Sequence, residues 1–227
     1  MDNINKIKNL SIWIFVVPFI SLNACLILIT NFHQFFSLEQ VVLPTIPYID
    51  VGVSISRTAR VFPTYLIFKP AMFITAFFLI QYWRFNSDLM RKISPYLNYK
   101  KFFLFFGVGS AIFLVLHSIF LGIKFDNDFY KLFRRVLVLA FIIFEIIAQT
   151  ILVINLFKIK EQIKQLINSR ILNFKITLVS ILIVVAFVSI PFLAAEGYNS
   201  FKHALEWNYF IGVISFYLLT FFFWKKQ

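Results

Sequence analysis

Six long apolar runs constrain the fold of this chain more than any other feature of its sequence. Each is close to the roughly 20 residues that an α-helix needs to cross a bilayer. Lipid offers the backbone no hydrogen-bond partner, so each run is expected to satisfy its own backbone groups as a helix. The predicted spans are Leu10–Ile29, Tyr65–Trp83, Phe102–Ile123, Val136–Phe157, Ile176–Ala195 and Trp207–Trp224. The sequence therefore predicts an all-α integral membrane protein, a six transmembrane helix bundle.

The composition agrees with a membrane protein of one domain. Apolar residues make up 60% of the chain and charged residues 14%, against about half and about a quarter in soluble domains. Residues 1–227 contain no low-complexity linker or repeat and are expected to form a single domain. The first apolar run is too long for a cleaved signal peptide. The only cysteine, Cys25, lies within that run and has no partner for an intramolecular disulfide.

The distribution of basic residues predicts how the chain sits in the membrane. Of the 22 Lys and Arg residues, fourteen fall in the two termini and the second and fourth connections, and seven in the other three connections. By the positive-inside rule both termini are expected in the cytoplasm, in an endomembrane or plasma membrane if eukaryotic and in the inner membrane if bacterial. Basic loops are attracted to anionic headgroups, so the net charge of +12 requires no nucleic-acid partner.

The first connection, from about Thr30 to Thr64, is the only long one. A loop of this length usually has a function or a structure of its own. Pro44 and Pro47 break any helix there, and residues 51–56 alternate between apolar and small side chains in a short strand-like or amphipathic pattern. We expect a structured outer loop that folds back over the mouth of the bundle.

The fourth connection, "KIKEQIKQLINSR", places an isoleucine at every fourth position, with cations between them. This spacing predicts a helical extension at the cytoplasmic interface. A solvated extension of the fourth helix fits the pattern equally well.

Three ionisable residues lie inside the predicted spans, where each charge is costly. Lys69 is about one turn from the outer end, so its ammonium group is expected to reach the interface. Glu145 lies near the middle of its span with Gln149 on the same helical face, which leaves open a ligand-facing role or a hydrogen-bonded packing role. For His117, an interhelical hydrogen bond and a chemical role both remain open.

Further polar residues lie before the sixth span. His203 and Glu206 are three residues apart and share a helical face. With Asp126 and Asp128 of the third connection they have the residue types of a metal site or an acid-base pair. No metal-binding motif is present, however, and the chain has only three histidines. We therefore predict no metal and no cofactor.

Two short patterns resemble a known family of six-helix membrane proteins. Pro47, Tyr48, Ile49, Asp50 and Gly52 match a "PYI(S/D)…G" segment of the outer loop, and a "FP…F" approach to the second helix follows. The start of the sixth helix matches in Gly197, Tyr198, Phe201, Glu206 and Trp207. With its order of helices, the chain is similar to the family of post-GPI-attachment factor 2, the damage-regulated autophagy modulators and the N-terminal region of yeast cell-wall protein 43.

The resemblance also raises a question about how the outer loop is held. Relatives often carry cysteines in that loop and before the sixth helix, and this chain has none there. We expect packing and ion pairs to hold the loop instead, for example Asp50 or Glu206 with Arg57 or Arg60.

The family implies lipid handling: remodelling of GPI-anchor lipid, lysosomal autophagy or phosphoinositide-dependent membrane organisation. Membrane lipids are then the expected partners, with acyl chains between the helices and a headgroup at the outer end. The candidate lipid- or headgroup-binding residues are Asp50, Arg57, Arg60, His117, Glu145, His203 and Glu206.

Two other functions remain open. A membrane-embedded acyl transferase or lipase would use His203 or His117 as its base, but the sequence offers no distinctive nucleophile. An ion or proton transporter would use Glu145 and Gln149. The sequence leaves open whether the protein is an enzyme and favours a non-enzymatic role.

Overall fold

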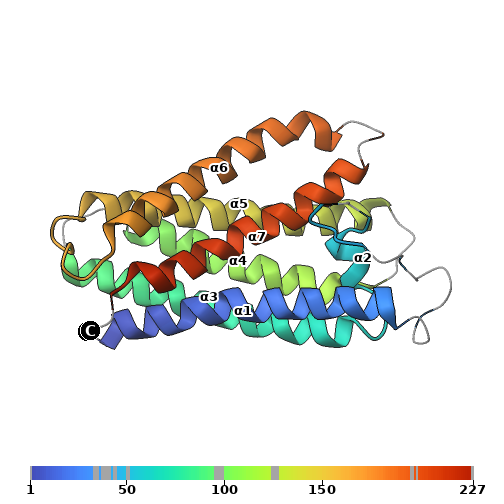
Figure 1. Cartoon of the computed structure of the whole chain (residues 1–227), viewed down its shortest axis with the longest axis horizontal. Helices are drawn as coiled ribbons and strands as arrows, with labels where there is room; N and C mark the ends of the chain where they lie inside the picture. The colour runs from blue at the N-terminus through green and yellow to red at the C-terminus, as the bar shows by residue number, and fades with distance from the viewer. Residues whose placement is uncertain are drawn as a thin grey trace.

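The computed structural model is a bundle of six long helices and one short helix, with no strand among the residues it describes (Figure 1). Those residues are 2–32, 36, 42, 45–49, 52–94, 100–123, 128–194, 197 and 199–225. The helices are α1 (Asp2–Asn31), α2 (Ile55–Ala59), α3 (Tyr65–Ile93), α4 (Lys100–Phe120), α5 (Asp128–Lys158), α6 (Ser169–Ala194) and α7 (Asn199–Phe223). Six are long and apolar enough to cross a membrane. The predicted class, an all-α bundle of six transmembrane helices, is confirmed.

Several helices begin before the apolar runs that predicted them. α1 begins at Asp2 rather than Leu10, α5 at Asp128 rather than Val136, and α7 at Asn199 rather than Trp207. The added turns carry charged side chains, which a helix tolerates at the membrane interface. Hydropathy locates the lipid-embedded part of a helix, so it underestimates the full helical length.

The long helices pack as neighbours around one core. α1 packs against α3 and α7, α3 against α4, and α4 against α5. α6 contacts α7 and α5, and it rises away from α5 toward the end of the bundle opposite the termini (Figure 1). In its most apolar stretch of 18 residues only 22% are buried, against 33–44% in the other five spans. α6 is therefore the least covered helix.

A glycine allows α3 and α4 to approach closely. The indole of Trp83 is fully buried, with its ring centroid 5.1 Å from that of Tyr82 and 6.2 Å from that of Phe103. Gly107 of α4 lies directly against this indole, and a Cβ at that position would be 2.3 Å from the ring. Small residues are the usual means by which membrane helices come into contact.

The connection between α5 and α6 does not form the predicted helical extension. Residues 159–168 are a series of turns that end in an isolated bridge. Ile159, Ile163 and Ile167 are buried. The turns are joined to the end of α7, because the Asn168 amide donates to the Phe223 carbonyl at 2.8 Å. The four-residue spacing therefore reflects burial of the turns rather than a helix.

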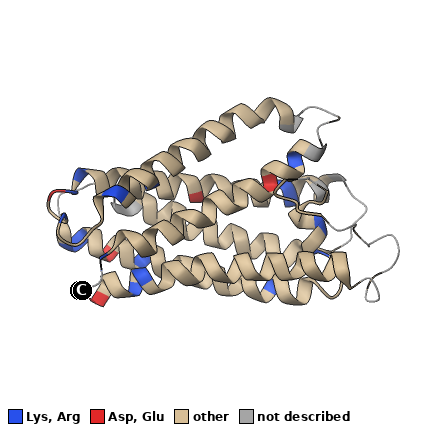
Figure 2. Cartoon of the chain, in the orientation of Figure 1, with Lys and Arg blue, Asp and Glu red and all other residues tan. Residues whose placement is uncertain are grey.

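Basic residues occupy both ends of the bundle and are scarce along its middle (Figure 2). The start of α1 and the end of α7 lie at one end. We call the opposite end, where α2 lies, the outer end. There Lys69 donates to the Ile119 carbonyl at 3.3 Å, close to the end of α4. This position agrees with the expectation that its ammonium group reaches the interface.

Candidate functional site

Glu206 of α7 holds the short helix α2 over the outer end. Its carboxylate oxygens accept hydrogen bonds from the backbone amides of Ile55 at 3.2 Å and Ser56 at 3.3 Å. Amides in the first turn of a helix have no partner within the helix. The N-cap residue Ser54 accepts a further bond from the Arg57 amide at 3.2 Å. We assign Glu206 a positioning role, because it orients the helix that carries Arg57 and leads to Arg60.

The neighbouring part of the outer loop is also fixed to α7 and α1. The indole Nε1 of Trp207 donates to the Val53 carbonyl at 2.8 Å, and the Asn208 amide donates to the Tyr48 carbonyl at 3.1 Å. The Tyr48 hydroxyl donates to Asn23 Oδ1 at 3.2 Å. Burial raises the pKa of Tyr48, which keeps its hydroxyl protonated as a donor. The described part of the loop therefore lies over the mouth of the bundle, as expected.

A cationic cluster forms beneath α2. Partial burial lowers the pKa of Arg60, and the nearby charges of Arg134 and Arg57 lower it further. The Arg60 side chain still reaches solvent. Its carbonyl lies against Gly122, where a Cβ would be 2.9 Å from that oxygen and where φ is +86°. This close contact brings Arg60 against the residues that follow α4, the helix that packs along α5, which carries Arg134.

His117, in the last turn of α4, completes the cationic cluster. The charge of Arg134 acts on it across the contact between α4 and α5. The guanidinium of Arg134 lies 5.7 Å from the ring of Tyr130, whose hydroxyl donates to the Phe120 carbonyl at 2.8 Å. His117 Nδ1 and Arg134 Nε are buried and have no hydrogen-bond partner in the described part of the chain. We call Arg57, Arg60, His117 and Arg134 the arginine cluster.

Three sequence candidates remain. Asp50 lies outside the described residues. His203 lies near the start of α7. Glu145 is in the middle of α5, where it contacts Ser110, Gln149 and Tyr217, away from the arginine cluster. The predicted pairing with Gln149 is present, since Gln149 Nε2 donates to Glu145 Oε1 at 3.0 Å.

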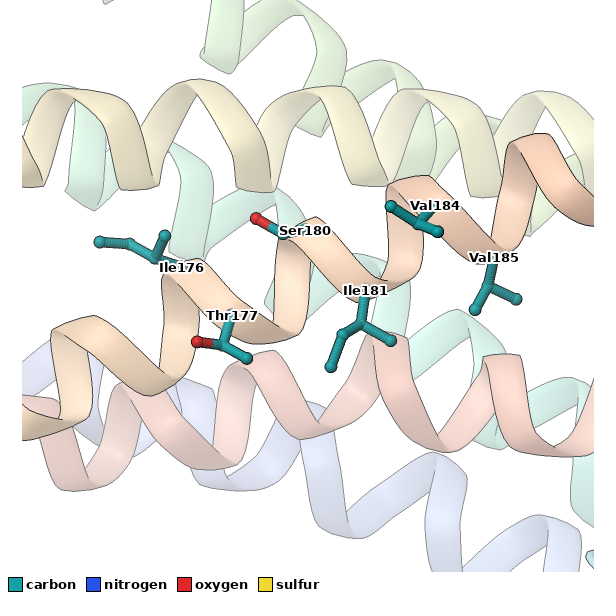
Figure 3. Close-up of a pocket in the computed structure, with 6 residues that line it drawn as sticks. All are labelled: Ile176, Thr177, Ser180, Ile181, Val184 and Val185. Carbon is teal, nitrogen blue, oxygen red and sulfur yellow. The ribbon is translucent and has the colours of Figure 1, made fainter.

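A shallow apolar groove runs along the outward face of α6 (Figure 3). Its volume is about 360 Å³, and its lining residues are Ile176, Thr177, Ser180, Ile181, Val184 and Val185. They form two rows at four-residue spacing, which is the separation of side chains on one helical face. All of these residues belong to α6, so the groove is an open, mainly apolar strip along one helix.

Two charged residues were not recognised from the sequence as candidates in their own right. Arg134 counted only as one cation of an outer connection, although it joins the arginine cluster. Lys175 counted as a cation of a cytoplasmic connection, but it lies in the second turn of α6 and is fully buried. α6 begins at Ser169 rather than at Ile176, and Asn168, whose Oδ1 accepts from the Arg170 amide at 3.1 Å, is the capping signal for this start.

Comparison with family models, with curated proteins and with solved structures gives no match for this chain. The fold and the site nevertheless define a class. The protein is an integral membrane protein of six transmembrane helices.

Proposed function

We propose that this protein handles a phosphate-bearing membrane lipid, whose headgroup binds in the arginine cluster at the outer end. The observation that carries the proposal is electrostatic: the charges of Arg134 and Arg57 both act on Arg60, and the charge of Arg134 acts on His117. Guanidinium groups bind phosphate through paired hydrogen bonds. Like charges repel when they are brought together, so an anion between them stabilises the arrangement.

The acyl chains of the lipid would lie along the apolar surface of the bundle. The groove on α6 and the low burial of that helix support this part of the proposal. The resemblance to the family of post-GPI-attachment factor 2 agrees with it, because GPI-anchor lipids also carry a phosphodiester. Membrane lipids are then the partners of the protein.

Binding rather than catalysis is proposed because a catalytic histidine needs a nucleophile or acceptor within reach, and the sequence offers no distinctive one.

Native mass spectrometry of protein extracted from mixed membranes tests the proposal. Wild type is expected to retain phosphatidylglycerol in preference to a diacylglycerol glycoside, which has no phosphate. The double variant Arg60→Gln/Arg134→Gln should lose at least about tenfold in retention, since one charged hydrogen bond contributes about 1.5–3 kcal/mol.

The matched control for this measurement is Arg135→Gln. Arg135 is an exposed cation next to Arg134, and its replacement removes charge without touching the arginine cluster. Equal phosphatidylglycerol retention by the double variant and by Arg135→Gln would contradict the proposal.

We further propose that both termini face the cytoplasm. The support is the collection of described cations at the end of the bundle that holds the termini: Lys6, Lys8, Arg84, Arg91, Lys92, Lys158, Lys160, Lys164, Arg170 and Lys225. The proposed membrane is an endomembrane or plasma membrane if the source is eukaryotic, and the inner membrane if it is bacterial.

Labelling of single cysteines in intact cells checks this orientation. In a Cys25→Ser background, Ile49→Cys should react with a membrane-impermeant maleimide, because Ile49 is exposed at the outer end. Lys164→Cys, exposed at the other end, should react only after the membrane is permeabilised. The reverse pattern would mean that the chain has the opposite orientation.

A further inference from the structure

Lys175 of α6 has a fully buried side chain inside the bundle. Its Nζ donates to Thr220 Oγ1 of α7 at 2.8 Å and lies 3.9 Å from the centre of the Phe216 ring and 5.3 Å from that of Phe223. No carboxylate of the described chain lies within ion-pairing distance of it. Burying an unpaired charge costs free energy, so such a group inside a membrane span is a candidate for a functional role.

Glu145 of α5 is the buried acid of the same core, 1% exposed. Ser110 of α4 donates to its Oε2 at 2.6 Å. Gln149 and the hydroxyl of Tyr217, on α7, donate to its Oε1. These three hydrogen bonds stabilise the ionised carboxylate, whereas its burial favours the neutral acid, so opposing effects act on its charge.

Tyr82 of α3 lies between the two charged groups. Its hydroxyl is 3.3 Å from Thr220 Oγ1, the atom that also binds Lys175. Its ring meets the ring of Tyr217 edge to face, with centroids 5.0 Å apart. Tyr217 and Thr220 are three residues apart on α7 and so lie on one face of that helix. Only the step between the two phenol hydroxyls lacks a hydrogen bond in the described structure.

We propose that Lys175 and Glu145 are the two ends of a proton relay through Thr220, Tyr82 and Tyr217. Each hydroxyl accepts a proton at its oxygen and releases its own to the next group. The net change converts the ammonium of Lys175 to an amine and the carboxylate of Glu145 to a carboxylic acid. No electrons move and no co-reactant is required. This activity does not depend on lipid binding at the arginine cluster.

In the observed conformation the relay is interrupted, so no proton can pass along it. The Thr220 hydroxyl donates to the Phe216 carbonyl at 2.9 Å, and the Tyr217 hydroxyl is bound to Glu145. Rotation of the Thr220 and Tyr82 side chains would connect the relay.

The charged and titratable groups around the relay come from three helices: Tyr82 of α3, Tyr217 of α7 and Lys8 of α1. Lys8 lies near the end of the bundle that holds the termini, where its Nζ donates to the Trp224 carbonyl at 3.2 Å.

Rapid-scan infrared spectroscopy of the protein in phosphatidylglycerol–phosphatidylcholine liposomes tests the relay. After a drop in pH on the side of the termini, wild type should develop a carboxylic acid C=O band that Glu145→Gln lacks. Lys175→Met and Thr220→Val should slow the rise of this band on the order of a hundredfold, the usual effect of losing a positioned proton-transfer group.

A further variant separates a relay from a structural role. Lys175→Arg keeps the positive charge and the hydrogen-bond donor, but arginine does not release its proton in proteins. It should therefore fold like wild type and slow the band as Lys175→Met does. The control is Thr75→Val, because the buried Thr75 hydroxyl bonds only to Ala71 of its own helix, at 2.8 Å.

The outcomes are distinct. A wild-type rate in Lys175→Arg and Thr220→Val would identify Lys175 as an anchor of α6 and overturn the relay. The absence of any pH-dependent carboxyl band in wild type would overturn it as well. If Lys175→Met does not fold, the other two variants still decide the question.

Discussion

Gly107→Ala is expected to destabilise the bundle by about 1–3 kcal/mol, the usual cost of overpacking a core. The new methyl group would lie 2.3 Å from the Trp83 indole. The indole has no free space to enter, because Tyr82, Phe103 and Tyr217 surround it. The expected measurement is a lower midpoint of thermal unfolding in a fixed detergent, followed by circular dichroism.

Gly212→Ala is the matched control for this substitution. Its Cβ would lie 2.7 Å from Leu182 Cδ2, the far end of a flexible side chain that can rotate away. Gly107→Ala should therefore unfold at a clearly lower temperature than Gly212→Ala. Equal midpoints would mean that α3 and α4 are not as close as described.

Glu206→Ala is expected to release α2 from α7. The substitution removes two hydrogen bonds to a charged acceptor, and such bonds contribute about 1.5–3 kcal/mol each. Hydrogen–deuterium exchange at the Ile55 and Ser56 amides should then accelerate strongly. Because α2 carries Arg57 and leads to Arg60, retention of phosphatidylglycerol should fall as well.

The conservative variant Glu206→Gln distinguishes the hydrogen bonds from the side chain as a whole. Its amide oxygen still accepts one backbone bond, so protection of the two amides should lie between those of wild type and Glu206→Ala. Unchanged exchange in Glu206→Ala would show that packing of Trp207 against Tyr48 holds the loop without the carboxylate.

The sequence was sufficient to predict the six helices but not their ends or their partners. Long apolar runs determine the lipid-embedded segments, because each must satisfy its own backbone. The interfacial turns of α1, α5 and α7 are polar, so hydropathy did not include them. The prediction of a helical extension over residues 159–168 was wrong, because their buried isoleucines lie on turns that hydrogen-bond to the end of α7, a contact that no local pattern reveals.

The candidate sites show the same division between local and tertiary information. The pairing of Glu145 with Gln149 follows from spacing on one helix and was predictable. The predicted role of Glu206 was an ion pair with Arg57 or Arg60. The described hydrogen bonds of its carboxylate are with the backbone amides of Ile55 and Ser56, partners that no side-chain pattern in the sequence indicates. Arg134 and Lys175 gain their importance from residues on other helices, so neither could be recognised before the helices were assembled.

The most direct test of the lipid proposal is a structure of the protein in nanodiscs of phosphatidylglycerol. The proposal predicts density for a phosphate group within hydrogen-bonding distance of both the Arg60 and the Arg134 guanidinium groups, with acyl density continuing along the bundle. A carboxylate of this chain between the two arginines, with no lipid phosphate there, would contradict it.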